Sequence, residues 1–127
     1  CCFVVEDERP LSGATGFLDW RLCGGLSKIL GSGFFVGAPG DKLLVPTDAR
    51  VPAKKVFAVG LGKSNGVTAL GLEHALTQAA AMLSRAQVDS VALAFPLLPT
   101  AVASTRDELV DRAFAPHFSG AVAVFSP

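Results

Sequence analysis

The sequence has no apolar run long enough to cross a membrane, although half of its 127 residues are hydrophobic. A membrane-spanning helix needs about 18 or more consecutive apolar residues. Here the Val, Ala, Leu and Phe residues occur in short runs, which are typical of strands covered on both faces of a sheet. With a mean hydropathy of +0.48, the composition predicts a soluble chain. Its length suits one domain, residues 1–127, with a single core.

The sequence also lacks an excess of either charge, because 11 basic residues balance 11 acidic ones. Binding to nucleic acid or to an anionic membrane requires a surface dominated by basic groups. The acidic cluster at 6–8 and the basic pair at 54–55 are too short to act as charged tails. We therefore expect no nucleic-acid partner and no membrane partner.

Residues that bind metals or act as nucleophiles are scarce. The three cysteines, Cys1, Cys2 and Cys23, form neither a disulfide framework nor a metal-ligand spacing, which favours reduced thiols in a cytoplasmic protein. His74 follows Glu73, but position 78 is Gln rather than the second His of a zinc-peptidase helix. No hydroxyl is paired with a recognisable general base. We therefore predict no catalytic residue, no metal site and no cofactor in this chain.

The amino-terminal end allows two further interpretations. An amino-terminal cysteine occurs in lipid-anchored secreted proteins, but here apolar residues follow Cys1 without a linker, which favours a strand. The absence of an initial Met indicates a trimmed or processed piece of a longer chain.

The chain is organised around residues 55–72, where an apolar strand runs through a glycine-rich turn into a long helix. This is the repeating unit of α/β sheets. Further strands are predicted at 1–5, 42–45, 88–95 and 121–125, and further helices at about 15–31 and 109–115. Strands 42–45 and 55–60 are joined without a helix, so they are expected to pair as an antiparallel hairpin. The predicted fold class is α/β with a mixed, mostly parallel sheet.

Single residues predict three local details. Thr15 is expected to cap helix 15–31 at its start. Gly24 and Gly25 lie inside that helix and predict a close approach to the sheet or to a neighbouring helix. Thr105 and Glu108 match a capping box, in which each side chain bonds the backbone N–H of the other residue.

One motif raises the possibility of a ligand site, the segment Gly-Leu-Gly-Lys-Ser at 60–64. A Walker A loop needs glycine at position 57, which is Phe, and a dinucleotide fingerprint needs glycine at 65, which is Asn. A tight turn from strand to helix needs glycines without any ligand. A structural turn is therefore the main interpretation. A ligand site is the alternative, formed by Gly60, Gly62, Lys63, Ser64 and Gly66.

Three segments in register resemble the N-terminal domain of the M17 leucyl aminopeptidase family. They are Gly-Phe-Leu-Asp-Trp-Arg-Leu-Cys-Gly-Gly-Leu-Ser from 16, Phe-Val-Gly-Ala-Pro-Gly-Asp-Lys-Leu-Leu-Val-Pro from 35, and Lys-Val-Phe-Ala-Val-Gly-Leu-Gly from 55. The resemblance implies a macro-domain-like, three-layer α/β/α sandwich. It also implies that two metal ions and a catalytic lysine and arginine belong to a separate C-terminal domain. That domain's Asn-Thr-Asp-Ala-Glu-Gly-Arg motif has no match here, so no catalytic residue is carried over.

The resemblance leaves three functions open. The first is a non-catalytic domain for oligomerisation, regulation or partner binding, which contacts another copy or its own missing catalytic domain. Trp20, Phe34 and Phe35 are its candidate contact residues, although such large apolar groups more often belong to a core. The second is a fragment of a complete di-metal leucyl aminopeptidase. The third is a macro-like nucleotide or ADP-ribose binder that uses the turn at 60–66 and the loop after Phe95.

Overall fold

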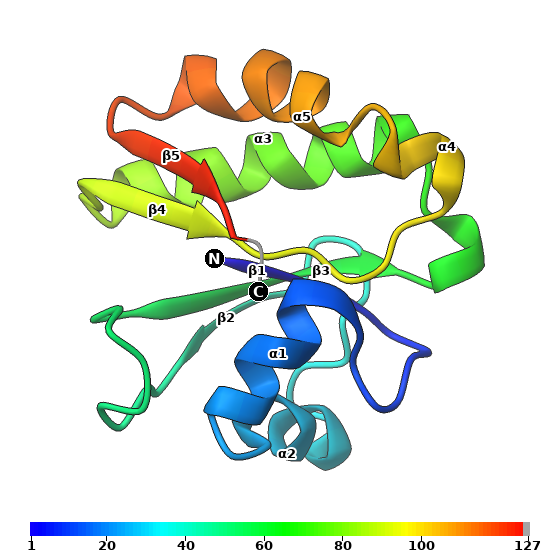
Figure 1. Ribbon diagram of the computed structural model, residues 1–127, viewed down its shortest axis with the longest axis vertical. Coiled ribbons are helices and arrows are strands. Elements are labelled where there is room, and N and C mark those ends of the chain that lie inside the picture. The colour runs from blue at the N-terminus through cyan, green and yellow to red at the C-terminus, as the bar shows by residue number, and fades with distance from the viewer. Residues whose placement is uncertain (126–127) are drawn as a thin grey trace.

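Five strands form one mixed sheet in the computed structural model, which describes residues 1–125. β1 (Cys2–Val5) is parallel to β3 (Val56–Gly62), and β2 (Lys42–Val45) is antiparallel to β3. β4 (Ser90–Leu93) and β5 (Ala121–Val124) form a parallel pair. A parallel bridge between Cys2 and Ala94 joins the two parts, so the order in space is β2-β3-β1-β4-β5. The predicted mixed, mostly parallel sheet and its one antiparallel hairpin are confirmed (Figure 1).

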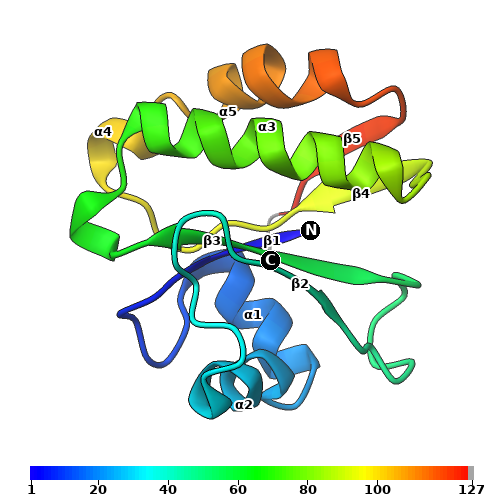
Figure 2. The same cartoon turned by 180° about the vertical axis from the view of Figure 1, so that it is seen from behind.

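Helices cover both faces of this sheet, which gives the three layers that the resemblance implied (Figures 1 and 2). On one face lie α3 (Ala69–Arg85) and α5 (Arg106–Leu109), and α5 continues into a π-helical turn (Val110–Phe114) and a 3-10 turn (Ala115–His117). On the other face lie α1 (Gly13–Arg21) and α2 (Gly25–Ser32). Among residues 1–125, no helix is long and apolar enough to span a membrane.

β1 occupies the centre of the sheet, and its side chains divide between two cores. Phe3 and Val5 belong to the cluster beneath α3 and α5, while Cys2 and Val4 belong to the cluster beneath α1 and α2. Successive side chains of a strand point to opposite faces, which explains this division. All four side chains are almost completely buried. The sequence Cys-Phe-Val-Val is therefore apolar throughout because neither face of β1 meets solvent.

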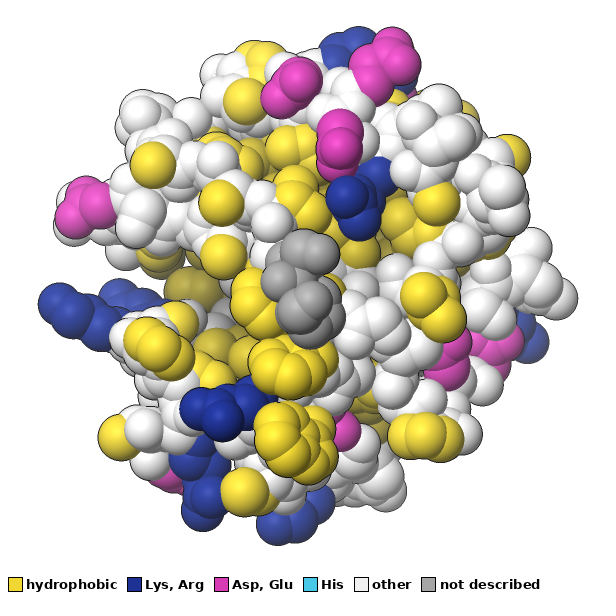
Figure 3. Space-filling model, viewed as in Figure 1, with side chains coloured by type: hydrophobic (Ala, Val, Ile, Leu, Met, Phe, Trp, Pro, Cys, Tyr) yellow, Lys and Arg dark blue, Asp and Glu magenta, His cyan; other side chains and the backbone are white. Residues whose placement is uncertain are grey.

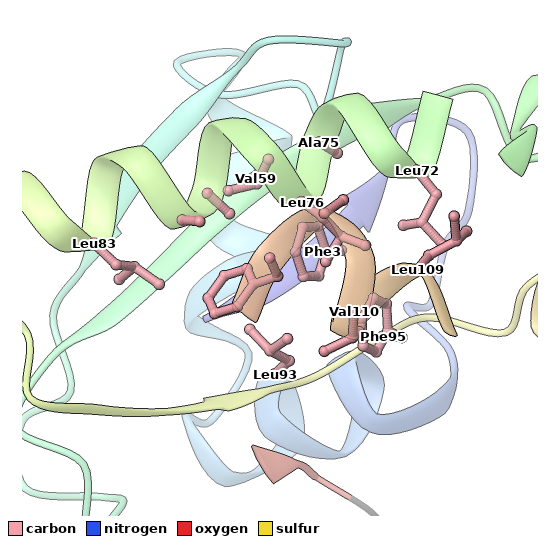
Figure 4. Close-up of a cluster of buried hydrophobic side chains, with 14 of the residues drawn as sticks. Phe3, Val59, Leu72, Ala75, Leu76, Leu83, Leu93, Phe95, Leu109 and Val110 are labelled. Carbon is pink, nitrogen blue, oxygen red and sulfur yellow. The ribbon is translucent and has the colours of Figure 1, made fainter. Parts of the chain in front are cut away.

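The larger core lies between the sheet and α3 (Figure 4). α3 buries one stripe of side chains, as its helical periodicity predicted: Leu72, Ala75, Leu76, Ala79 and Leu83. Phe3 stacks on Phe95 with ring centroids 4.9 Å apart. The helix begins after Thr68, whose side chain accepts a hydrogen bond from the N–H of Gly71 at 3.0 Å. A turn of 3-10 helix (Ser64–Gly66) separates it from β3.

The predicted single helix at 15–31 is wrong, because the chain turns between α1 and α2. Cys23 and Gly24 both adopt positive φ angles, +55° and +78°. The carboxylate of Asp19 is buried at this turn and accepts hydrogen bonds from the N–H groups of Leu26 (2.9 Å) and Ser27 (3.2 Å). A Cβ on Gly24 would have no neighbour within 4 Å, and one on Gly25 would meet only the Cβ of Leu22 at 3.5 Å, so the close approach predicted for these two glycines is wrong and Gly24 serves the turn.

Two predicted helix caps are also wrong. Thr15 lies inside the first turn of α1, and its buried hydroxyl donates to the carbonyl of Phe3 at 2.8 Å. The carbonyl of Ala94 lies 3.2 Å from the same hydroxyl, so Thr15 connects α1 to the middle of the sheet. Thr105 donates to the carbonyl of Val102 instead of forming a capping box. The short helix α4 (Thr100–Ala103) lies in a segment expected to be a loop.

We predict that Thr15→Val destabilises the domain by about 1–3 kcal/mol, because it keeps the side chain's shape but removes the donor to buried carbonyls. Chemical denaturation measures the difference. Thr77→Val is the matched control, since Thr77 is exposed and its hydroxyl bonds a carbonyl of its own helix at 3.0 Å, with only a long contact of 3.5 Å to the carbonyl of Ala113. Equal losses in the two variants would contradict the role assigned to Thr15.

Candidate functional site

Of the three glycines in the predicted ligand site, Gly60 and Gly62 lie in β3 itself and Gly66 lies in the turn that follows it, and the N–H groups of all three already have partners. Each N–H donates to a backbone carbonyl: Gly60 to Asp41 (2.9 Å), Gly62 to Gly37 (2.8 Å) and Gly66 to Lys63 (2.9 Å). A phosphate cradle requires N–H groups that point at the ligand. These three N–H groups are instead bonded within the protein.

Ser64 has a partner as well, the carboxylate of Asp7. The N–H of Ser64 donates to Oδ1 at 2.8 Å, and its hydroxyl donates to Oδ2 at 3.1 Å. The bond from the Ser64 N–H is the main reason that the pKa of the Asp7 carboxyl lies below its usual range. Asp7 is therefore ionised at neutral pH, and its negative charge lies where an anionic ligand would approach the turn.

Gly60 and Gly62 of β3 allow the loop at 36–41 to pack against this strand. A Cβ on Gly60 would overlap the backbone of Gly37 and Ala38. Gly62 has φ +85°, and a Cβ there would lie 2.9 Å from the ring of Pro39. Close packing and a left-handed conformation thus account for two glycines of the motif. Ligand binding by this turn stays a prediction.

We predict that Gly60→Ala destabilises the domain by about 2 kcal/mol or more, because a methyl group has no space beside the 36–41 loop. Gly66→Ala is the control. Its added methyl would meet nothing within 4 Å, so the free energy of unfolding changes by under about 0.5 kcal/mol. Chemical denaturation of both variants measures the contrast. Similar stabilities would show that the loop does not constrain this strand.

The predicted contact residues occupy different environments. Trp20 is 69 % exposed and Phe34 is 81 % exposed, but Phe35 is only 3 % exposed and belongs to the core beneath α2. Phe35 was therefore wrongly placed on a contact surface. The sequence alone did not distinguish these adjacent phenylalanines, because both lie in an irregular segment after α2, where no helix or strand period assigns side chains to a face.

Trp20 belongs to an exposed group of rings, which we call the aromatic patch and define as Phe17, Trp20 and Phe125. The ring of Phe17 lies 5.7 Å from that of Trp20 and 5.7 Å from that of Phe125. Phe17 and Trp20 are neighbours because residues three apart share one side of a helix. Their spacing in α1 was the available signal for this pair. Nothing in the sequence indicated that Phe125 joins them.

A cleft of ≈ 970 Å³ opens between the amino ends of β3 and β4, next to the aromatic patch. The cleft is lined by the two strands and by apolar side chains of the helical layers, including Phe17, Leu18 and Leu83. Figure 3 shows the hollow with apolar side chains in it and basic side chains nearby. The sequence gave no indication of this cleft, because it forms where strands distant in the chain come together.

Cys1 lies at the inner end of this cleft. Its α-amino nitrogen donates to the carbonyl of Ala92 at 2.9 Å. Burial is the main reason that the pKa of this amino group is lowered from its usual range. Burial also raises the pKa of the neighbouring Cys2 thiol to about 11, so Cys2 is not a thiolate nucleophile at neutral pH.

Other reactive groups do not gather into a site. His74 and His117 are exposed on different elements. Cys23 is exposed, with its sulfur 2.8 Å from a guanidinium nitrogen of Arg50. Within residues 1–125, no group of three or more His, Cys, Asp or Glu side chains is placed to hold a metal ion. The cleft and the aromatic patch are therefore the most prominent surface features.

Residues 2–113 match the family model described as the cytosol aminopeptidase family, N-terminal domain. The chain is 27 % identical over 90 residues to a probable cytosol aminopeptidase of Alkaliphilus metalliredigens, covering 71 % of this chain and 18 % of that protein. It is likewise 27 % identical over 94 residues to a probable cytosol aminopeptidase of Trichormus variabilis, covering 74 % and 19 %. The chain thus spans about a fifth of the length of these curated relatives.

The fold resembles part of a solved structure, a variant of tomato leucine aminopeptidase. The TM-score is 0.65 with 17 % sequence identity, and the match covers 98 % of this chain and 28 % of that one. This agreement confirms the α/β fold class.

Proposed function

This chain belongs to the cytosol aminopeptidase family as an N-terminal domain, and from that premise we propose that it is a non-catalytic domain for self-association. The observation that supports this function is the aromatic patch. Trp20 is 69 % exposed, yet its ring lies in contact distance of Phe17. Clustered exposed aromatic residues mark protein interfaces more often than isolated ones do.

The composition of the patch suits a contact with another protein. Tryptophan and other aromatic residues contribute strongly to binding where a partner excludes water from them. Phe17 and Trp20 are held on α1, so little conformational entropy is lost when a partner covers them. Arg21 lies next to the patch and makes no ion pair among residues 1–125. It is available at the rim of an interface, where charged groups are usual.

We predict that Trp20→Ala weakens self-association by about tenfold or more, as expected for an interface residue worth over 1.4 kcal/mol. Sedimentation velocity over a concentration series measures the oligomer. The melting temperature should change little, because Trp20 is largely exposed. Leu97→Ala is the control, because Leu97 is a similarly exposed apolar residue (71 %) that lies outside the patch. A wild-type chain that stays monomeric, or equal effects of the two substitutions, would refute this proposal.

A second function is favoured by the length comparison. The chain spans 18 % and 19 % of relatives named as probable cytosol aminopeptidases. We propose that the parent protein is a di-metal leucyl aminopeptidase of the cytoplasm, whose catalytic residues and metal ions lie outside the present chain. This proposal is compatible with the first, because the same domain can assemble the enzyme. No comparable observation favours nucleotide or ADP-ribose binding, since the N–H groups of Gly60, Gly62, Ser64 and Gly66 donate within the protein.

The native polypeptide is expected to be several times larger than the 13.1 kDa of this chain. Immunoblotting of the native host, or top-down mass spectrometry, measures its mass. A native mass near 13.1 kDa would exclude the aminopeptidase proposal and leave assembly or partner binding as the function.

A further inference from the structure

The turn between β3 and α3 carries the only asparagine of the sequence, Asn65, and a glycine follows it. Asn65 lies in the middle of the 3-10 turn Ser64–Gly66, and both Asn65 and Gly66 are exposed. Among residues 1–125, the side-chain amide of Asn65 has no hydrogen-bond partner. This amide is therefore open to solvent and is not held in place by the rest of the domain.

An asparagine that precedes glycine is prone to a reaction with its own main chain. The backbone nitrogen of the glycine gives up its proton to solvent and attacks the side-chain amide carbon, because glycine has no Cβ to hinder the approach. A new C–N bond closes a succinimide ring, while the bond to the amide nitrogen breaks and ammonia leaves. Water then opens the ring at either carbonyl. The net reaction consumes water, releases ammonia and leaves aspartate or isoaspartate.

Gly66 has the space that this reaction requires. A Cβ on Gly66 would meet no atom within 4 Å. Gly60 and Gly62 differ in this respect, because the loop at 36–41 packs closely against both. The surroundings of Gly66 therefore do not obstruct closure of a ring between its nitrogen and the side chain of Asn65.

The folded turn keeps the two reacting atoms apart. In a 3-10 turn the ψ angle is about −20° to −30°, and the succinimide ring closes only after ψ of the asparagine rotates out of this helical range. The N–H of Gly66 also donates to the carbonyl of Lys63 at 2.9 Å. The reaction therefore requires the turn to open and this hydrogen bond to break.

A contact from the loop after β1 holds the turn closed. Asp7 accepts hydrogen bonds from the N–H of Ser64 at 2.8 Å and from its hydroxyl at 3.1 Å. The loop and the turn lie side by side at the same end of the sheet (Figures 1 and 2). Ser64 lies inside the turn that the bond from Gly66 to Lys63 closes, so fixing Ser64 restrains the whole turn.

We propose that Asn65 is a site of spontaneous deamidation and that the contact between Asp7 and Ser64 controls its rate. While Asp7 holds Ser64, the nitrogen of Gly66 stays bonded to Lys63 and cannot reach the amide carbon of Asn65. When the contact breaks, the turn opens locally and the ring closes. The rate of deamidation therefore follows the local opening of this turn and not the global unfolding of the domain.

The products weaken the same contact that controls their formation. Aspartate or isoaspartate at position 65 adds a negative charge beside Ser64, and the carboxylate of Asp7 is repelled by it. Isoaspartate also lengthens the main chain by one carbon, so the bond from Gly66 to Lys63 no longer has the geometry of a 3-10 turn. Both products therefore loosen the connection between β3 and α3.

The test incubates the folded chain in mildly alkaline buffer and measures conversion of Asn65 by peptide mass spectrometry, which separates amide from acid. Asp7→Ala should convert about threefold faster or more, because it removes two hydrogen bonds to Ser64. Glu6→Ala is the matched control, since it removes the adjacent carboxylate, which does not bond Ser64. Gly66→Ala should convert far more slowly, because its Cβ hinders the attack.

Two further measurements connect the rate to the turn. Amide hydrogen exchange at Gly66, followed by NMR, should accelerate in Asp7→Ala by a factor similar to the increase in conversion. Ser64→Ala keeps the bond from its N–H to Asp7 and loses the bond from the hydroxyl. It should therefore convert at a rate between those of the unsubstituted chain and Asp7→Ala.

Equal conversion in Asp7→Ala and Glu6→Ala would overturn the control assigned to Asp7. An Asn65 that stays intact in the folded chain, under conditions where the chain unfolded in urea converts, would overturn the site itself. Unchanged conversion in Gly66→Ala would exclude attack by the main chain. These measurements do not depend on Trp20 or on the oligomer, so they fail independently of the proposed assembly function.

Discussion

The pairing of β1 with both β3 and β4 is the constraint on which the rest of the fold depends. β1 provides the connection between the two parts of the sheet, through the bridge from Cys2 to Ala94. Its alternating side chains also contribute to both cores. The hydroxyl of Thr15 in α1 donates a hydrogen bond to the carbonyl of Phe3, which connects α1 to β1. Four residues thus determine how the two helical layers are positioned, and the cleft and the aromatic patch both lie at the amino end of this strand.

Elements with a strong local pattern were predictable from the sequence. The apolar stripe of α3 from Leu72 to Leu83 and the alternation between strand and helix identified the fold class, because each pattern has the period of its own structure. The hairpin of β2 and β3 followed from a connection too short to hold a helix. The resemblance to leucyl aminopeptidases placed the chain in the family that the comparisons then showed.

Features that depend on contacts between distant segments were not predictable. Leu22 and Leu26 keep helical spacing across the break between α1 and α2, since both sides of the break bury leucines in the same core. Asp19 belongs to α1, but its carboxylate accepts hydrogen bonds from N–H groups in the first turn of α2. The cleft depends on β3 and β4 extending beyond β1, and the patch requires Phe125 to reach Phe17. The spacing of hydrophobic residues along one sequence does not reveal which distant segments come into contact.

The central position of β1 also has a consequence for biosynthesis. A ribosome makes this strand before either neighbour, since its partners Ala58 and Ala94 occur much later in the chain. Until β4 emerges, the strand has an unpaired edge and apolar side chains on both faces, which are the features that promote aggregation. The sheet is therefore not expected to be complete until β4 and β5 have left the ribosome, and until then the nascent chain is a suitable client for chaperones that shield extended apolar segments.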